Sequence, residues 1–518
     1  MNNETDPREF AGTGIPDNPN GSAGTGIPDN PNGFAGTGIP DNANGSAGTG
    51  IPDNANGSAG AGIPDNANAS PGAGGPGGAD RPGKLRDRIS VGLKYLFEKG
   101  AFYIFAGNFL SRFTAFFGSI FLIRILSKER YGILVYAENI YTYACLFAGL
   151  GMAYSLLRYM VLAKSPEEKL AYYRYAIRKS TIINVLLVVL VAVVGSLYPH
   201  PEKFSDARWL LPLLLLVLPF QNILDHTLYT HRAQFANKRF AVASLLSSVF
   251  VILARAFGGY VGDLFGVAVA VAAANALVGL LFMGDIRRTY FKGISPSVLS
   301  RDARSEASRY SLQYMATNSI WAIIMLNDIF LLGQLLGNEA IVADYKVAYV
   351  LPANLSIISA AVGIFVGPYF VRREKDRAWV WKNYKRTLFI NAGAIGAAAA
   401  VLYVAAEPII TLLYGTEYSN VVPLMRVLLI AAFINSGLRF MTAHLLSSMN
   451  RIFYNIMVSL SGVLLQIGAN IYVIPRYGSI GVAYVSVAVF SLMTVALLVI
   501  FVRLYRRPRV GSAESGAK

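Results

Sequence analysis

The chain has 518 residues, of which 54% are hydrophobic and 15% are charged, and it carries a formal net charge of +16. Soluble domains average about 45–50% apolar and about 25% charged residues, so this composition excludes an ordinary soluble protein and indicates membrane helices. Basic residues beside membrane spans explain the positive charge, so we expect no nucleic-acid partner.

The N-terminal region is built from a short repeat. Five copies of a twelve-residue unit, first seen as Ala11-Gly-Thr-Gly-Ile-Pro-Asp-Asn-Pro-Asn-Gly, follow one another. Each copy carries one large apolar residue, which is too little for a hydrophobic core, so residues 1–80 are predicted to be a disordered tail. Residues 81–100 are basic and partly apolar, and are expected to form a cytoplasmic segment before the first span.

About twelve apolar stretches follow the tail, and most reach the roughly 20 residues that a bilayer core requires. The fold class expected is therefore an all-α polytopic membrane protein with about twelve transmembrane helices in two six-helix bundles around a central cavity. The stretches lie near residues 101–123, 133–157, 181–199, 209–230, 240–259, 263–283, 311–336, 340–370, 387–405, 421–445, 453–473 and 481–502.

The chain is predicted to consist of two halves. Residues 108–129 and 318–339 align at a spacing of 210, with Asn108 opposite Asn318 and Glu129 opposite Glu339. This is a parallel repeat of the kind found in secondary transporters. The domains expected are an N-terminal bundle at 101–283, a basic cytoplasmic linker at 284–310, a C-terminal bundle at 311–502 and a basic cytoplasmic tail at 503–518.

Charge predicts the orientation of the spans. With the N-terminus inside, 33 of the 46 Lys and Arg residues lie in the inside segments and five in the outside connections. Basic residues concentrate on the cytoplasmic side of membrane proteins. Both termini are therefore expected in the cytoplasm.

Ionisable residues inside the spans are the candidate functional groups, because each costs about 2.5–3.5 kcal/mol at the centre of a membrane helix. The cations outnumber the acids, which predicts a basic lumen for an anionic substrate. The candidates for that lumen are Arg112, Arg439, Arg255, Arg426 and Asn108. Candidates for ion coupling are Asp225, Asp328 and Glu138.

Structural roles compete with these functional ones. Arg255 and Arg426 could extend along their helices and place their charged ends at the membrane–water interface. Arg112 fits a buried ion pair with Glu138. Asp225 and Asp328 fit hydrogen-bonding groups between helices.

No enzyme, cofactor or metal site is evident in the sequence. The single cysteine, Cys145, excludes an internal disulfide and a cysteine-based zinc site, and the four histidines are scattered. A glycine-rich approximation to a phosphate-binding loop ends in Gly83-Lys84-Leu85, where Ser or Thr should follow the lysine. The outside connections are short, and none offers a set of catalytic side chains.

Three glycine-based motifs carry a resemblance. Leu126-Ser-Lys-Glu-Arg-Tyr131-Gly132, then Gly149-Leu-Gly151-Met-Ala, and Tyr477-Gly-Ser-Ile-Gly481-Val-Ala483 are similar to those of bacterial polysaccharide exporters of the O-antigen flippase (Wzx-like) type. The resemblance covers roughly residues 95–505, and the motifs are shared with the wider multidrug/oligosaccharidyl-lipid/polysaccharide exporter superfamily. It leaves the tail unexplained.

The resemblance implies a transporter rather than an enzyme. Such proteins move an undecaprenyl-pyrophosphate-linked oligosaccharide from the inner to the outer leaflet of the bacterial inner membrane by alternating access. The partners implied are this lipid-linked anionic glycan, membrane lipid and other polysaccharide-assembly proteins.

Three other functions stay open. A cation-coupled multidrug exporter of the same superfamily would use Asp225 and Asp328. A membrane glycosyltransferase or polymerase would need an external catalytic region. A scaffold would lack a cavity between the halves.

Overall fold

The computed structural model describes residues 101–449 and 451–506, and within them every regular element is a helix. Nine of the helical segments in this part of the chain are long and apolar enough to cross a membrane. The protein is thus a multi-pass membrane protein, as the composition predicts. The expected tail at 1–80, the pre-span segment at 81–100 and the end of the C-terminal tail lie outside the described residues.

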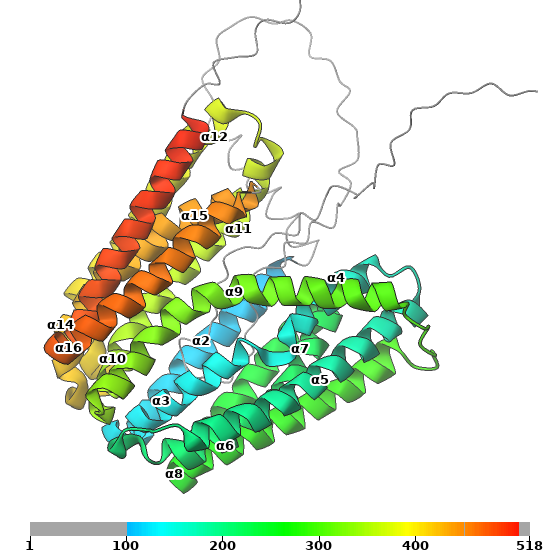
Figure 1. Ribbon diagram of the computed structural model, residues 1–518, viewed down its shortest axis with the longest axis horizontal. Coiled ribbons are helices and arrows are strands. Elements are labelled where there is room, and N and C mark those ends of the chain that lie inside the picture. The colour runs from blue at the N-terminus through cyan, green and yellow to red at the C-terminus, as the bar shows by residue number, and fades with distance from the viewer. Residues whose placement is uncertain (1–100, 450, 507–518) are drawn as a thin grey trace, which may run out of the picture. The chain divides into compact units, whose positions relative to one another are not determined.

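The first half of the chain forms helices that all precede the loop at residues 291–300 (Figure 1). Polar side chains set several helix starts: Ser127 and Ser165 accept hydrogen bonds from backbone N–H groups of α3 and α5. The helices are α2 (Ala101–Ile125), α3 (Lys128–Cys145), η1 (Ala148–Gly151), α4 (Met152–Leu162), α5 (Pro166–Leu197), η2 (Glu202–Phe204), α6 (Ala207–Leu215), α7 (Val217–Ala233) and α8 (Asn237–Tyr290).

The second half repeats this pattern of long helices with short connections (Figure 1). The long apolar stretch at 340–370 is divided at Leu355, three residues after Pro352, which separates α10 from α11. The helices are α10 (Glu339–Asn354), α11 (Ser356–Arg372), α12 (Arg377–Val404), α13 (Ala406–Tyr414), η3 (Thr416–Val421), α14 (Val422–Ala432), η4 (Phe433–Phe440), α15 (Met441–Ser448) and α16 (Ile452–Tyr505).

Two helices of 54 residues each contain a break. In α8 the backbone leaves helical geometry at Gly262 and Asp263, and Gly258 lies directly against the carbonyl of Gly266, so the two segments pack on each other. In α16 the break is at Gly478, where φ is +60°. Glycine adopts this left-handed geometry without the steric cost of a side chain. Each helix can supply two spans, and the count of twelve stays a prediction.

Helix α9 (Arg301–Leu336) contacts both halves. Near its start, the backbone carbonyl of Ala307 accepts a hydrogen bond from Ser155 Oγ of α4, at 2.8 Å. Further along, α9 packs against α16. The boundary predicted at residue 311 falls inside this helix, so α9 ties the first half to the second.

Helices α3 and α10 form the closest contact between the two halves (Figure 1). A Cβ atom on Gly132 would lie 1.9 Å from the carbonyl oxygen of Glu339, so only glycine permits this approach. One buried apolar cluster runs through both halves, with Leu134 and Val347 each fully buried in it.

Candidate functional site

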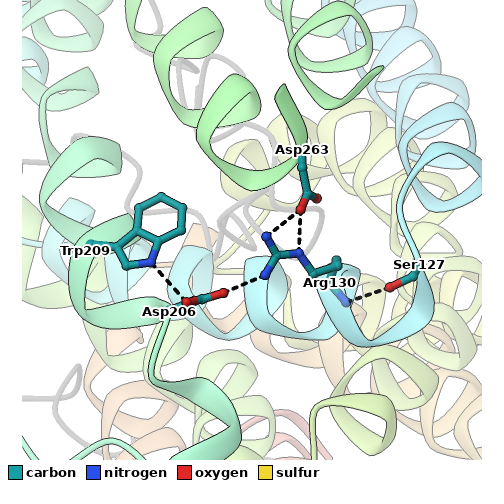
Figure 2. Close-up of polar contacts among 5 residues, drawn as sticks. All are labelled: Ser127, Arg130, Asp206, Trp209 and Asp263. Carbon is teal, nitrogen blue, oxygen red and sulfur yellow. Dashed lines mark hydrogen bonds and ion pairs between the residues drawn. The ribbon is translucent and has the colours of Figure 1, made fainter. Parts of the chain in front are cut away.

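The motif at residues 126–132 organises one end of the first half. Ser127 caps α3, and the Arg130 guanidinium bridges two carboxylates, with 2.5 Å to Asp206 Oδ2 and 2.5 Å to Asp263 Oδ2 (Figure 2). Asp206 also accepts a hydrogen bond from the Trp209 indole, at 3.1 Å (Figure 2). Arg130 therefore ties the α5–α6 connection and the break in α8 to the start of α3.

The neighbouring Lys128 contacts the second half instead. Its ammonium group lies 2.6 Å from Asp344 Oδ1 of α10, and the same carboxylate accepts a hydrogen bond from Asn420, at 2.8 Å. The ammonium also lies 5.1 Å from the ring centre of Tyr418. Within one motif, Lys128 thus forms an ion pair with the second half, and Arg130 forms ion pairs within the first half.

Glu138 and Arg255 form an ion pair inside the helices. Their side chains are 7% and 9% exposed, and Arg255 Nη2 lies 2.6 Å from Glu138 Oε1. Lys346 of α10 is also buried and interacts electrostatically with both. Glu138 is thus an ion-pair partner of Arg255, the place for which the sequence analysis weighed Arg112.

Arg439 is the most deeply buried cation among the candidates, with 1% of the residue exposed. Its guanidinium carbon stacks 3.8 Å from the ring centre of Trp321 on α9, and its Nε donates a hydrogen bond to Asn435 Oδ1, at 2.6 Å. Among the described residues, Arg439 has no ion pair with an acid, and its buried Nη1 meets no acceptor. In the described part of the chain, the positive charge of Arg439 is therefore stabilised by an aromatic ring and an amide, and not by a carboxylate.

Arg439 lies in η4, a π-helical segment within the α14–α15 stretch. The wider turn frees backbone carbonyls, and neighbouring helices satisfy them. Asn391 Nδ2 donates to the carbonyls of Ser436 and Gly437, at 3.1 and 2.8 Å, and Ser359 Oγ donates to that of Ser436, at 2.7 Å. Single π-helical turns within α-helices frequently mark functional positions, and here three side-chain hydrogen bonds maintain one.

Asp328 of α9 forms a second polar centre in the second half. Its carboxylate accepts hydrogen bonds from Tyr345 Oη at 2.7 Å, from Gln466 Nε2 and Asn470 Nδ2 at 2.8 Å each, and from Ser486 Oγ at 3.4 Å. The amide oxygens of Gln466 and Asn470 are buried and have no hydrogen-bond donor in the described part of the chain. Rotating either amide would turn an oxygen toward the carboxylate and create an oxygen-lined site.

The remaining candidates lie apart from these centres. Asp225 on α7 accepts a hydrogen bond from Gln221, at 3.1 Å. Arg426 donates to the carbonyl of Tyr403, at 3.3 Å, and lies over the same tyrosine ring. Arg112 is partly buried on α2 and has an interaction partner. The side chain of Asn108 lies outside the described part.

The arginines predicted for one lumen therefore have separate surroundings, and their membership of a single lumen stays a prediction. Sequence reasoning missed Trp321, Gln466 and Asn470. A signal existed for the last two, since polar residues four apart in an apolar stretch share one helix face. The sequence gives no signal for Trp321, because aromatic residues are common in membrane spans.

Comparisons with known proteins agree on the fold. A family model described as "Polysaccharide biosynthesis protein" matches residues 97–374. An inward-facing multidrug resistance MATE family transporter of the MOP superfamily matches with a TM-score of 0.64 and 15% identity, covering 76% of this chain and 96% of that one. Lipid II flippase MurJ, in an inward closed conformation, matches with a TM-score of 0.61 and 14% identity, covering 77% and 89%.

A MOP superfamily transporter from Pyrococcus furiosus, whose binding pocket is described as having reverse polarity, matches with a TM-score of 0.54 and 16% identity, covering 79% of this chain and 94% of that one. No curated protein sequence matches the chain. At these identities the likenesses show the fold alone, which this chain shares with those transporters.

Proposed function

The chain belongs to the polysaccharide biosynthesis protein family, and from that premise we propose that it is a flippase for a lipid-linked oligosaccharide. The substrate proposed is an undecaprenyl-pyrophosphate-linked glycan, moved from the inner to the outer leaflet for a cell-surface polysaccharide. The solved flippase with the same fold, MurJ, is described as acting on another lipid-linked molecule, lipid II.

The observation that carries this proposal is Arg439. A cation inside a membrane helix costs about 2.5–3.5 kcal/mol on insertion scales, so it persists where it has a function. Among the described residues no acid pairs with Arg439, and its Nη1 has no acceptor. A guanidinium stays charged at cellular pH and binds phosphate oxygens through two hydrogen bonds. A pyrophosphate group supplies the missing acceptors and the missing charge.

Asp328 is proposed to couple an ion or a proton to this movement. A carboxylate with two rotatable amides and two hydroxyls offers hard oxygen ligands once the amides turn. A membrane potential that is negative inside also favours outward movement of an anion, by about 2.3 kcal/mol per charge per 100 mV. Glu138 is a weaker candidate for coupling, because it already neutralises Arg255. Asp225 is also a weaker candidate, because Gln221 is the one amide seen to donate a hydrogen bond to it among the described residues.

A cation-coupled multidrug exporter is the second candidate. Asp328 favours it, because a buried carboxylate can exchange a substrate cation for a coupling ion. Arg439 opposes it, because an uncompensated buried cation repels a cationic drug.

Transport assays in proteoliposomes separate the two functions. We expect the purified full-length protein to move a fluorescent undecaprenyl-pyrophosphate saccharide between leaflets, and an uncharged analogue without the pyrophosphate far more slowly. Export of a cationic dye with no movement of the pyrophosphate lipid would overturn the flippase proposal and favour the exporter.

Both termini are proposed to lie in the cytoplasm of a bacterial cell. Ser205 and Ser300 are exposed and lie in connections predicted on opposite sides, so single cysteines there report orientation. With Cys145 replaced, an impermeant thiol reagent added to intact cells should label Ser205→Cys and spare Ser300→Cys. The opposite labelling would reverse the topology.

A further inference from the structure

A cavity of about 540 Å³ lies in the second half, away from Arg439 and Asp328. Its wall includes Lys375 and Glu374 from the α11–α12 connection, Arg377 at the start of α12, Arg451 just before α16, and Tyr505 at the end of α16. Three separate chain segments thus converge on one hollow.

The cavity lies at the ends of candidate membrane spans. Candidate spans end or begin at Arg372, Arg377, Ser448, Ile452 and Tyr505, and each wall residue is within three positions of one of these ends. Head groups of phospholipids occupy this level, where acyl chains below them run along the helices.

The charge of the wall is positive. Among the described wall residues, the cations Lys375, Arg377 and Arg451 accompany one acid, Glu374, and the Tyr505 phenol interacts electrostatically with Arg451, Arg377 and Glu374. Two neighbours on the connection have other contacts: Arg373 stacks on Trp379, at 5.2 Å, and Asp376 caps α12. The described wall residues therefore carry more positive than negative charge.

Part of the cavity wall is apolar. Leu504 and the buried Met449 line it, and Tyr505 packs on Phe501, with ring centres 4.8 Å apart. A wall with both basic and apolar side chains matches an amphiphile, with its anionic group at the cations and its hydrocarbon at the apolar side chains. Free inorganic phosphate would use the basic side chains alone.

We propose that this cavity binds the phosphate group of an anionic phospholipid. Arg377 and Arg451 contact the phosphate oxygens, Lys375 adds charge, and the Tyr505 hydroxyl donates a further hydrogen bond. Basic pockets between membrane helices at the cytoplasmic surface are suited to such head groups. A lipid held there joins the α11–α12 connection to both ends of α16, so it stabilises the second half independently of transport.

Native mass spectrometry of the full-length protein in detergent tests this proposal, with phosphatidylglycerol and phosphatidylcholine titrated separately. The protein should retain the first phosphatidylglycerol more tightly than phosphatidylcholine, and Lys375→Gln with Arg451→Gln should reduce that preference by on the order of tenfold. The matched control, Lys292→Gln with Arg301→Gln, removes the same charge from exposed positions in the connection before α9 and at the first residue of α9, and should keep the preference.

A second variant and a second ligand keep the test decisive. Lys375→Arg with Arg451→Lys preserves the charge and should retain the preference, which separates loss of charge from loss of folding. Equal loss in the pocket pair and the control pair would overturn the proposal. Equal thermal stabilisation by inorganic phosphate and by phosphatidylglycerol at the same concentration would overturn the lipid as the ligand.

Discussion

Arg255 and Arg439 are both buried arginines in membrane helices, but their surroundings differ. Arg255, in the first half, lies 2.6 Å from the carboxylate of Glu138. Arg439, in the second half, stacks on Trp321 and has no acidic partner among the described residues. The comparison separates two uses of a buried charge, since a paired cation stabilises helix packing and an unpaired one is available to a ligand.

The largest effect is expected from Glu138→Ala, which leaves Arg255 and Lys346 as buried cations without their acid. Breaking a buried pair by removing one partner costs about 3–5 kcal/mol. The apparent melting temperature in detergent should fall sharply, while the exposed acid Glu407 replaced by Ala should leave it unchanged. Equal stability of the two variants would contradict the structural role of the pair.

Asp328→Asn should preserve the fold and abolish ion dependence. The Gln466 and Asn470 amides can rotate to meet the new amide, so the loss of stability should stay below about 1.5 kcal/mol. Asp328→Leu should cost more, because it strands donors at about 1–3 kcal/mol each. Transport measured with and without an ion gradient checks this prediction, and persistent ion dependence in Asp328→Asn would remove Asp328 from coupling.

Trp321→Ala should uncover position 439. With Cys145 replaced, Arg439→Cys should react several-fold faster with a membrane-permeant thiol reagent in the Trp321→Ala background than in Trp321→Phe, because phenylalanine keeps most of the ring. Equal reaction rates would mean that Trp321 does not cover this position.

The smallest effect is expected where Lys128 meets Asp344. Ion pairs near a surface contribute at most about 1 kcal/mol, so the coupling energy between Lys128→Gln and Asp344→Asn should be favourable but no larger than about 1 kcal/mol. A double-mutant cycle on melting in detergent measures it. A coupling energy of zero would indicate that the two halves do not use this contact in the purified protein.

Much of the fold follows from the sequence because apolar length and charge asymmetry directly reflect the bilayer. The break at Gly478 and the cap at Ser127 also lie in residue types suited to those positions. Helix α9 was less predictable: the sequence at its start is typical of a polar linker, but Ser300 caps a helix there that contacts α4.

The site was predictable only in part. Apolar context identified Arg255, Arg439, Asp328 and Glu138 as unusual, but it could not assign partners, because pairing depends on how helices rotate against one another. Arg112 was weighed as the partner of Glu138, and the structure gives that place to Arg255. The π-helical turn that holds Arg439 has no sequence signature beyond a polar run containing glycine.

The central claim is that Arg439 binds the substrate anion, and pyrophosphate-lipid transport by Arg439 variants tests it most directly. In proteoliposomes with equal amounts of folded protein, Arg439→Ala should lose transport at least tenfold, and Arg439→Lys should keep part of it because the charge survives without the guanidinium fork. Arg426→Ala, which removes an arginine held at Tyr403, should transport more than Arg439→Ala. Wild-type transport rates in folded Arg439→Ala would contradict the account.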